Sequence, residues 1–364
     1  MASVTLKSPY ALPTPVKWGT LLVLVLALTA FPVVFSNPTI TSIGVFTLIF
    51  GISASAWNIF SGYTGYIVIG SAVFYGIGQY TVALLASHFS IPGGWEQIAL
   101  LPVAGLFAGL ASVPIGWLLL RVRSHTFIIL TVAVMYVFQL CAFNFRSLTQ
   151  GSLGVFVSQP GWAGATFNDP FYYVALGIMI VAVAMSLWVR QSKFGLSLLA
   201  IKNDENRALG LGIKTQQIKL VAFAILAVFI GLAGGIYAMF VGNVEPQFAF
   251  NPVFDVTILI MTMAGGIGTV AGPVVGVLLL APLQQDMLVQ FGSNNYYLIV
   301  YGIVFLLILK LLPSGIVPTV TDWWRRFVIW RKRLNVVAGG PSKGDPSISR
   351  DPAVTAEVIA ELSQ

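Results

Sequence analysis

The chain has 364 residues, of which 57% are hydrophobic and only 9% charged, and its formal net charge is +7. A soluble globule of this composition would have too little polar surface to stay dissolved, whereas a membrane protein exposes apolar side chains to lipid. The basic excess does not indicate nucleic-acid binding, because the Lys and Arg residues lie between apolar stretches and not among aromatic residues on a polar face. The composition therefore predicts an all-α, polytopic transmembrane helical bundle that contacts the lipid bilayer and no nucleic acid.

Apolar stretches long enough to cross a membrane recur along the chain. A hydrocarbon core of about 30 Å needs about 20 helical residues. The first stretch follows Lys7 and Lys17, as a secretion signal would, but no small-residue cleavage site follows, so we interpret it as a span. The spans are expected at 18–35, 39–60, 66–88, 98–120, 125–143, 171–189, 217–240, 254–285 and 296–312.

The chain is predicted to have one membrane domain and two flanking segments. Residues 1–17 are expected to be a cytoplasmic N-terminal segment, and residues 18–318 the transmembrane domain. Residues 319–364 are basic at first and then rich in Gly, Pro and Ser, so we expect a flexible cytoplasmic tail.

The Lys and Arg residues predict the orientation, because such residues accumulate on the cytoplasmic side. With cytoplasmic N- and C-termini, all of the 19 basic residues except Arg146 fall inside. This arrangement requires that the stretch 254–285 crosses an even number of times, since the loops 241–253 and 286–295 both need to be outside. The stretch must therefore turn inside the membrane or at its inner edge, and two crossings there would give about ten spans.

The sequence GGIGTVAGPVVG within 254–285 supplies the required turn, because its glycines and proline break a helix. Non-helical backbone at membrane depth is tolerated only where it is buried in protein or lines a wet cavity. One interpretation is a pair of half-length helices beside a substrate route. The other is close helix packing through glycines at intervals of four. Both stay open, and the candidate path residues are Gly265, Gly266, Gly268, Thr269, Gly272 and Pro273.

Side chains that carry chemistry are scarce in the predicted spans. No His, Cys, Asp and Glu grouping has the spacing of a metal site, no Ser, His and Asp arrangement suggests a hydrolase, and the absence of a Gly-Lys dipeptide excludes a P-loop. We expect no catalytic residue, no metal and no cofactor, and a driving force supplied by a partner. Cys141 is expected to be a buried, inert thiol. The ionisable residues fall at span ends, where interfacial solvation is expected: His88, His125, Asp255, Asp286 and Lys310.

The loop 190–216 is the largest one on the cytoplasmic side. Its sequence SKFGLSLLAIKNDENRALGLGI combines a short apolar run with a charged cluster and ends at Gly210 and Gly212. This pattern predicts a short amphipathic helix that is stopped by glycine. A charged connection exposed to water is the alternative.

This segment resembles the cytoplasmic coupling loop of branched-chain amino acid ABC transporter permeases, whose pattern is roughly G-R-x-x-x-A-I-R-x-[ND]-E-x-x-A-x-x-x-G-I. Other blocks follow in the family's order: SGYTGYIVIGSAVFYGIGQY, LTQGSLGV, GLAGGIYA, GGIGTVAGPVVG and LPSGIVP. Together they cover most of residues 50–318. The matching places in the loop are held by Gly195, Ala200, Ile201, Lys202, Asp204, Glu205, Ala208, Gly212 and Ile213.

The resemblance implies an importer subunit of a bacterial inner membrane without an ATPase site of its own. It implies four partners: a homologous second permease, two cytoplasmic ABC ATPase subunits and an extracytoplasmic solute-binding protein. The cargo would be branched-chain amino acids or a related small polar solute such as urea, an amide or an aromatic or other organic acid. The solute stays open, because the chain has Tyr66-Ile67-Val68-Ile69-Gly70-Ser71 where the family usually has Gln-Leu-Ser-Leu-Gly-His, and Gln79 replaces a usual Ala.

Two groups of residues receive expected roles from the topology and the resemblance. Gly195, Ala200, Lys202, Asp204, Glu205 and Gly212 are expected to couple the chain to an ATPase, with Glu205 accepting hydrogen bonds from it. Gln150, Ser152 and Glu245 are expected in outer loops that dock the binding protein. Ordinary solvated loops are the alternative for this second group.

Two other classes of function stay open. A secondary, ion-coupled carrier needs a functional carboxylate inside the membrane, for which Asp255 and Asp286 are the candidates. A membrane enzyme or scaffold predicts a convergent set of polar groups, which the sequence does not show.

Overall fold

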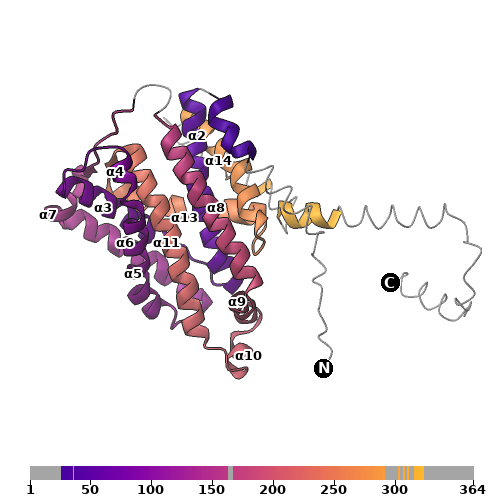
Figure 1. The fold of residues 1–364 in the computed structure, drawn as a ribbon. Coiled ribbons are helices and arrows are strands. Elements are labelled where there is room, and N and C mark those ends of the chain that lie inside the picture. The colour runs from indigo at the N-terminus through magenta and orange to yellow at the C-terminus, as the bar shows by residue number, and fades with distance from the viewer. Residues whose placement is uncertain are drawn as a thin grey trace, which may run out of the picture. The chain divides into compact units, whose positions relative to one another are not determined.

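The computed structural model describes residues 26–35, 37–162, 167–291, 302–303, 306–307, 310 and 315–323, and most of them are helical (Figure 1). The all-α class is confirmed. By their contacts, residues 1–318 form one compact unit and residues 319–364 another, and all elements named below lie in the first. The long helices are α2 (Pro38–Trp57), α3 (Ala72–His88), α5 (Leu101–Leu119), α6 (Ser124–Asn144), α8 (Asp169–Gln191), α11 (Thr215–Val241), α13 (Pro252–Gly265) and α14 (Ala271–Phe291).

Short elements connect these helices. The strands β1 (Val155–Phe156) and β2 (Asn243–Val244) pair antiparallel, with Val155 opposite Val244. A π-helical turn, η1 (Asn58–Gly62), continues α2. The others are α4 (Trp95–Ile98), α7 (Arg146–Thr149), the 3-10 turn η2 (Gly151–Leu153), α9 (Lys193–Asn203), α10 (Glu205–Gly210) and α12 (Pro246–Ala249).

Helices α2 and α11 form the centre of the bundle. Helix α11 packs against α5, α3 and α2, and α2 also packs against α8 and α14. Close approach of α3 to α11 depends on glycine, because a Cβ atom at Gly78 would lie 2.0 Å from the carbonyl oxygen of Gly231. Small residues at such contacts let helix backbones pack tightly in a membrane, where no hydrophobic effect drives helices together.

Seven helices among the described residues are long and apolar enough to cross a membrane. Within the chain, 83% of the apolar window of the span that includes α2 is buried, against 28% and 22% for the spans that include α5 and α6, so α5 and α6 lie at the outside of the bundle. The predicted span 18–35 is described only from residue 26 onward, and most of the predicted span 296–312 lies outside the described residues. The total of about ten spans and the orientation of the termini therefore stay predictions.

The predicted span 66–88 is wrong in its first six residues, because helix α3 begins only at Ala72. Gly65 has a φ of 76°, which ends the preceding helical turn in a left-handed conformation. Gly70 lies so close to α6 that a Cβ atom there would meet the carbonyl oxygen of Thr131 at 2.1 Å. The apolar run Tyr66–Ile69 is therefore a non-helical segment, which hydropathy alone does not distinguish from helix.

The break expected in the glycine-rich block is confirmed. Helix α13 ends at Gly265 and α14 begins at Ala271, and between them Gly266 and Gly268 have φ angles of 124° and 76°. The expectation of two half-length helices is wrong for α14, because its 21 residues span about 32 Å.

Cys141 is exposed on α6, so the prediction of a buried thiol is wrong. Its apolar neighbours belong to a helix that faces lipid on much of its surface, and there an apolar environment along the sequence does not imply burial in protein.

The packing of α3 on α11 can be tested with matched glycine substitutions. We expect Gly78→Leu to lower the free energy of unfolding by at least about 1–3 kcal/mol, because the added side chain meets backbone atoms. Gly177→Leu on α8 is the control, since nothing lies within 4 Å of a Cβ atom there. Thermal unfolding of the detergent-solubilised protein measures both. Equal melting temperatures for the two variants would contradict the proposed contact.

Candidate functional site

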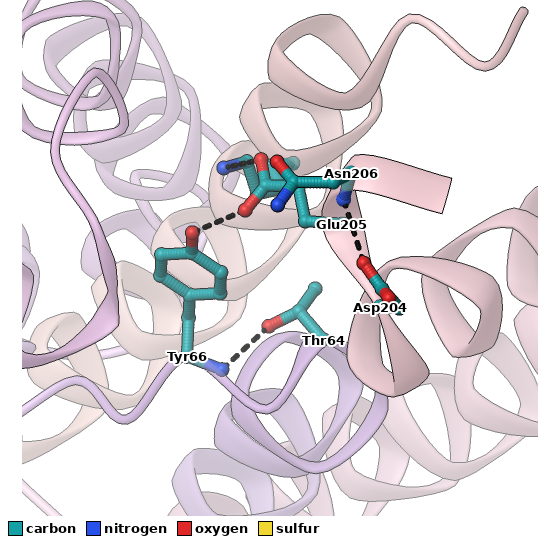
Figure 2. Close-up of polar contacts among 6 residues, drawn as sticks. Thr64, Tyr66, Asp204, Glu205 and Asn206 are labelled. Carbon is teal, nitrogen blue, oxygen red and sulfur yellow. Dashed lines mark hydrogen bonds and ion pairs between the residues drawn. The ribbon is translucent and has the colours of Figure 1, made fainter. Parts of the chain in front are cut away.

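The loop between α8 and α11 folds as two short helices, α9 and α10, so the expectation of a single helix is wrong. The Ser192 hydroxyl caps α9 by accepting a hydrogen bond from the backbone N–H of Gly195 at 3.1 Å. The Asp204 carboxylate caps α10 by accepting from the N–H groups of Asn206 and Arg207 at 2.9 and 3.1 Å (Figure 2). Gly212, with a φ of 80°, follows α10 and is the expected glycine stop.

Glu205 is bound within its own chain by two other residues, and we call these three the Glu205 clasp. Its Oε1 lies 2.6 Å from the Nζ of Lys219, and its Oε2 accepts a hydrogen bond from the Tyr66 hydroxyl (Figure 2). The Lys219 side chain is only 3% exposed, and its ammonium also lies 4.3 Å from the centroid of the Tyr66 ring. The clasp thus connects the start of α10, the start of α11 and the non-helical segment before α3.

The electrostatics of the loop follow from these contacts. Burial alone would raise the pKa of Glu205, but the hydrogen bonds from Lys219 and Tyr66 and the charge of Lys219 outweigh burial and hold this pKa below its ordinary value. Burial, assisted by the nearby Arg190, lowers the pKa of Lys202. The Glu205 carboxylate is therefore ionised at neutral pH and has both oxygens occupied by its own chain.

Two further cations of this region bind the backbone where helices are interrupted. Lys202 Nζ donates to the carbonyl oxygen of Gly62 at 2.9 Å, and the Arg190 guanidinium donates to the carbonyl oxygen of Gly268. Asn58 joins these two interruptions, because its Nδ2 donates to the Thr269 carbonyl and its Oδ1 accepts from the Gly268 N–H, both at 2.8 Å. Lys202 in the loop, Arg190 at the end of α8 and Asn58 therefore join the end of η1 and the α13–α14 break in one hydrogen-bonded network.

The glycine-rich break itself is closely packed. A Cβ atom at Gly265 would lie 1.7 Å from the carbonyl oxygen of Gly272, and one at Gly272 would lie 2.2 Å from the carbonyl oxygen of Gly266. Pro273, in the first turn of α14, is buried. These contacts favour the packing interpretation for the candidate path residues. A substrate route along them stays a prediction.

Asp255 is fully buried, so the prediction that it lies solvated at an interface is wrong. Its Oδ1 accepts from the Ser71 hydroxyl, and its two oxygens lie 3.1 and 3.2 Å from the backbone nitrogen of Ala72. A carboxylate at this place accepts hydrogen bonds from free N–H groups at the start of helix α3. Its negative charge also stabilises the positive end of the helix dipole. Asp255 lies in the first turn of its own helix, where Val253 is exposed, but its side chain points into the bundle toward the start of α3. The sequence signal for a helix start at this place was the Gly70-Ser71 pair, which interrupts an apolar stretch.

The two predicted docking loops lie together in the structure. The pairing of β1 with β2 brings the segment that contains Gln150 and Ser152 next to the segment that contains Glu245. Gln150 and Ser152 are exposed, whereas Glu245 is half-buried. The Oε1 of Glu245 accepts from Asn243 Nδ2 at 2.8 Å, so part of this carboxylate is already occupied.

Among the described residues, no group of three or more His, Cys, Asp and Glu side chains could hold a metal ion.

The clasp predicts different effects for the substitution of two cations that pair with carboxylates of this region, Lys219 in α11 and Arg207 in α10. We expect Lys219→Met to loosen α10, because it leaves the part-buried Glu205 carboxylate without its cation, and removing one partner of a buried pair costs up to about 3–5 kcal/mol. Arg207→Met is the control, since the Arg207–Asp204 pair is exposed and is worth at most about 1 kcal/mol. Hydrogen–deuterium exchange of residues 204–211 measures the effect. Slower or unchanged exchange in Lys219→Met would refute the clasp.

Asp255 predicts a graded loss of stability. Asp255→Ala leaves the Ser71 hydroxyl and the Ala72 N–H unpaired, at about 1–3 kcal/mol for each buried group. Asp255→Asn keeps one acceptor and should fall between Asp255→Ala and the wild type. Melting temperatures in detergent give the order. Wild-type stability in Asp255→Ala would show that the carboxylate does not cap α3.

Comparison with known proteins places the chain in a family. A family model described as branched-chain amino acid transport system / permease component matches residues 39–309. The chain is 28% identical over 321 residues to the high-affinity branched-chain amino acid transport system permease protein LivM of Escherichia coli (strain K12), which covers 81% of this chain and 73% of LivM. With LivH of the same strain it shares 25% identity over 288 residues, or 73% of this chain and 90% of LivH.

A more distant similarity is to the ribose import permease protein RbsC of Bacillus subtilis (strain 168), with 29% identity over 143 residues, or 36% of this chain and 44% of RbsC. No solved structure matches the chain. The matched residues 39–309 include both helix interruptions, the loop of α9 and α10, and Lys219. The chain therefore belongs to the branched-chain amino acid transport permease family, a family of ABC importer permeases.

Proposed function

We propose that the chain is the membrane-spanning permease subunit of an ATP-binding-cassette importer in a bacterial inner membrane. Its cargo is a branched-chain amino acid or a related small polar solute. The observation that carries this proposal is the attachment of the α9–α10 loop to the interruption before α3 through Lys202 and Glu205, next to the bond from Arg190, at the end of α8, to the α13–α14 break. A loop fixed in this way can transmit force from a partner to the middle of the bundle.

The proposal includes four partner subunits: a homologous second permease, two cytoplasmic ABC ATPases that hydrolyse ATP, and an extracytoplasmic solute-binding protein. The two proposed contact regions lie at opposite ends of the bundle, since α11 begins after α10 and runs for 27 residues, about 40 Å, before β2 and Glu245. The loop is then available to an ATPase on one side, and Gln150, Ser152 and Glu245 to a binding protein on the other.

The exposed face of the loop suggests where the ATPase binds. The Glu205 carboxylate is occupied internally, but Leu209 and Leu211 are 52% and 80% exposed. Apolar side chains this exposed on a polar loop are typical of a contact surface. In this proposal Leu209 and Leu211 bind the ATPase, and Glu205, Lys202 and Arg190 pass its rigid-body movement to the helix interruptions.

An ion-coupled carrier remains the alternative, and buried Asp255 is the observation that favours it, because such a carrier needs an intramembrane carboxylate. In the structure both carboxylate oxygens accept hydrogen bonds from the start of α3. Asp255 therefore already has a role in holding a helix.

Uptake by the purified importer in proteoliposomes separates these functions. We expect leucine uptake to require ATP, the ATPase and the binding protein. Uptake by the chain alone, driven by a proton or sodium gradient, would replace the importer proposal with the carrier.

Two variants separate docking from transmission. We expect Leu211→Asp to weaken ATPase co-purification about tenfold to hundredfold, from the loss of about 1.5–3 kcal/mol of apolar burial. Glu205→Gln should retain the ATPase but lose most ATP-driven uptake, because Lys219 is left without its anion. The control is Arg207→Met, which should change neither. Full uptake in Glu205→Gln, with the ATPase bound, would contradict transmission through the clasp.

A further inference from the structure

An open pocket of about 530 Å³, called the cavity below, lies between α2, the segment just before α8, the end of α11 and α14. Its size falls within the range of about 300–1,000 Å³ that is usual for small-molecule pockets. The residues that matter for its chemistry are Ser42, Ile43, Phe46, Asn168, Phe240 and Gln285.

The cavity lies at the end of the bundle away from the α9–α10 loop. Asn168 precedes the first residue of α8, whose other end leads into α9, and Phe240 is one residue from the end of α11, whose start follows α10. In Figure 1, α9 and α10 lie at the bottom of the bundle, and α2 is labelled at the top. In the proposed topology this end is extracytoplasmic.

Hydrogen-bonding groups of the cavity are left without partners. Gln285 is only 8% exposed, yet its carboxamide forms no hydrogen bond with any residue that the structure describes. The Ser42 hydroxyl has no partner among these residues either. Asn168 uses its Nδ2 to donate to the Pro38 carbonyl and the Thr41 hydroxyl, both at 2.8 Å, which leaves its Oδ1 available as an acceptor. These polar groups are open to the pocket, so a bound molecule can form hydrogen bonds with all three.

The rest of the lining is apolar and uncharged. Phe46 and Phe240 meet edge to face, with ring centroids 5.3 Å apart, and Ile43 lies beside them. No Asp, Glu, Lys or Arg is among the described residues that line the cavity. A bound ion with a net charge would have no counter-charge here, which is costly away from water. The lining fits a molecule that combines polar groups of no net charge with an apolar part.

We propose that this cavity is a solute-binding site in the extracytoplasmic half of the permease. It takes a small neutral or zwitterionic solute, whose polar groups pair with Ser42, Asn168 and Gln285 and whose apolar part packs on Phe46 and Phe240. The site adds a binding location to the proposed function and rests on that function for the direction of access. A solute released at the outer face would enter here before it passes through the bundle.

Cysteine labelling tests whether the cavity is open to the outer face. Cys141→Ser removes the single native cysteine, and Ser42→Cys then places a thiol in the cavity. We expect a membrane-impermeant thiol reagent, added outside intact cells, to modify Ser42→Cys. Ser53→Cys is the control on the same helix and should not react, because Ser53 is fully buried and its hydroxyl is bonded to the Ile49 carbonyl. No modification of Ser42→Cys would overturn the proposal.

Protection from the reagent tests solute binding. We expect L-leucine to slow modification of Ser42→Cys severalfold, and L-lysine and L-glutamate to have little effect. Adding Gln285→Leu should abolish protection. Adding Gln284→Leu should not, since Gln284 Nε2 faces Thr257 on α13, 3.4 Å from its hydroxyl. Modification that no solute slows would show a cavity that holds water alone and would overturn the site.

These results are separable from those of the importer test. Protection by leucine without ATP-dependent uptake would retain the site and reject the importer. ATP-dependent uptake without protection would retain the importer and reject the site.

Discussion

Backbone that leaves a helix inside a bilayer has no water to bind, and the structure depends on how this chain satisfies that backbone. Helices are interrupted before α3 and between α13 and α14. Asn58 pairs with the Gly268 N–H and the Thr269 carbonyl of the second interruption, and Asp255 accepts a hydrogen bond from the free Ala72 N–H at the start of α3. In each interruption, one side chain from a distant part of the sequence forms hydrogen bonds with free backbone groups. These bonds make the two interruptions parts of a single packed unit.

The loop of α9 and α10 and the end of α8 belong to this unit as well. Lys202 and Arg190 bind carbonyl groups that the interruptions leave free, and Glu205 binds the non-helical segment before α3 through Tyr66. The glycines at these places are required by close backbone approach and by positive φ angles. Permease motifs that are far apart in the sequence therefore meet at one place in the fold. The segments that carry the family resemblance are thus the segments that this hydrogen-bonded network joins.

Much of this fold follows from hydropathy and glycine content, and the exceptions have physical causes. The apolar stretches predicted α2, α5, α6, α8 and α11, and the glycine-rich block predicted the break after Gly265. Hydropathy failed at Tyr66–Ile69, because a non-helical segment buried in protein is as apolar as a helix. It also failed for Asp255, whose burial depends on a tertiary contact with Ser71. The pairing of Glu205 with Lys219 was equally out of reach, since sequence shows that a charge is present and not which charge it faces.

The Glu205 clasp also bears on how a complex assembles. Because α10 is held by its own chain through Lys219 and Tyr66, the loop has its shape before any partner arrives. Ordering a flexible segment on association would otherwise consume part of the binding free energy. A loop already folded in the isolated subunit offers a rigid, preorganised contact, so that a partner can exchange or dissociate without the permease losing local structure.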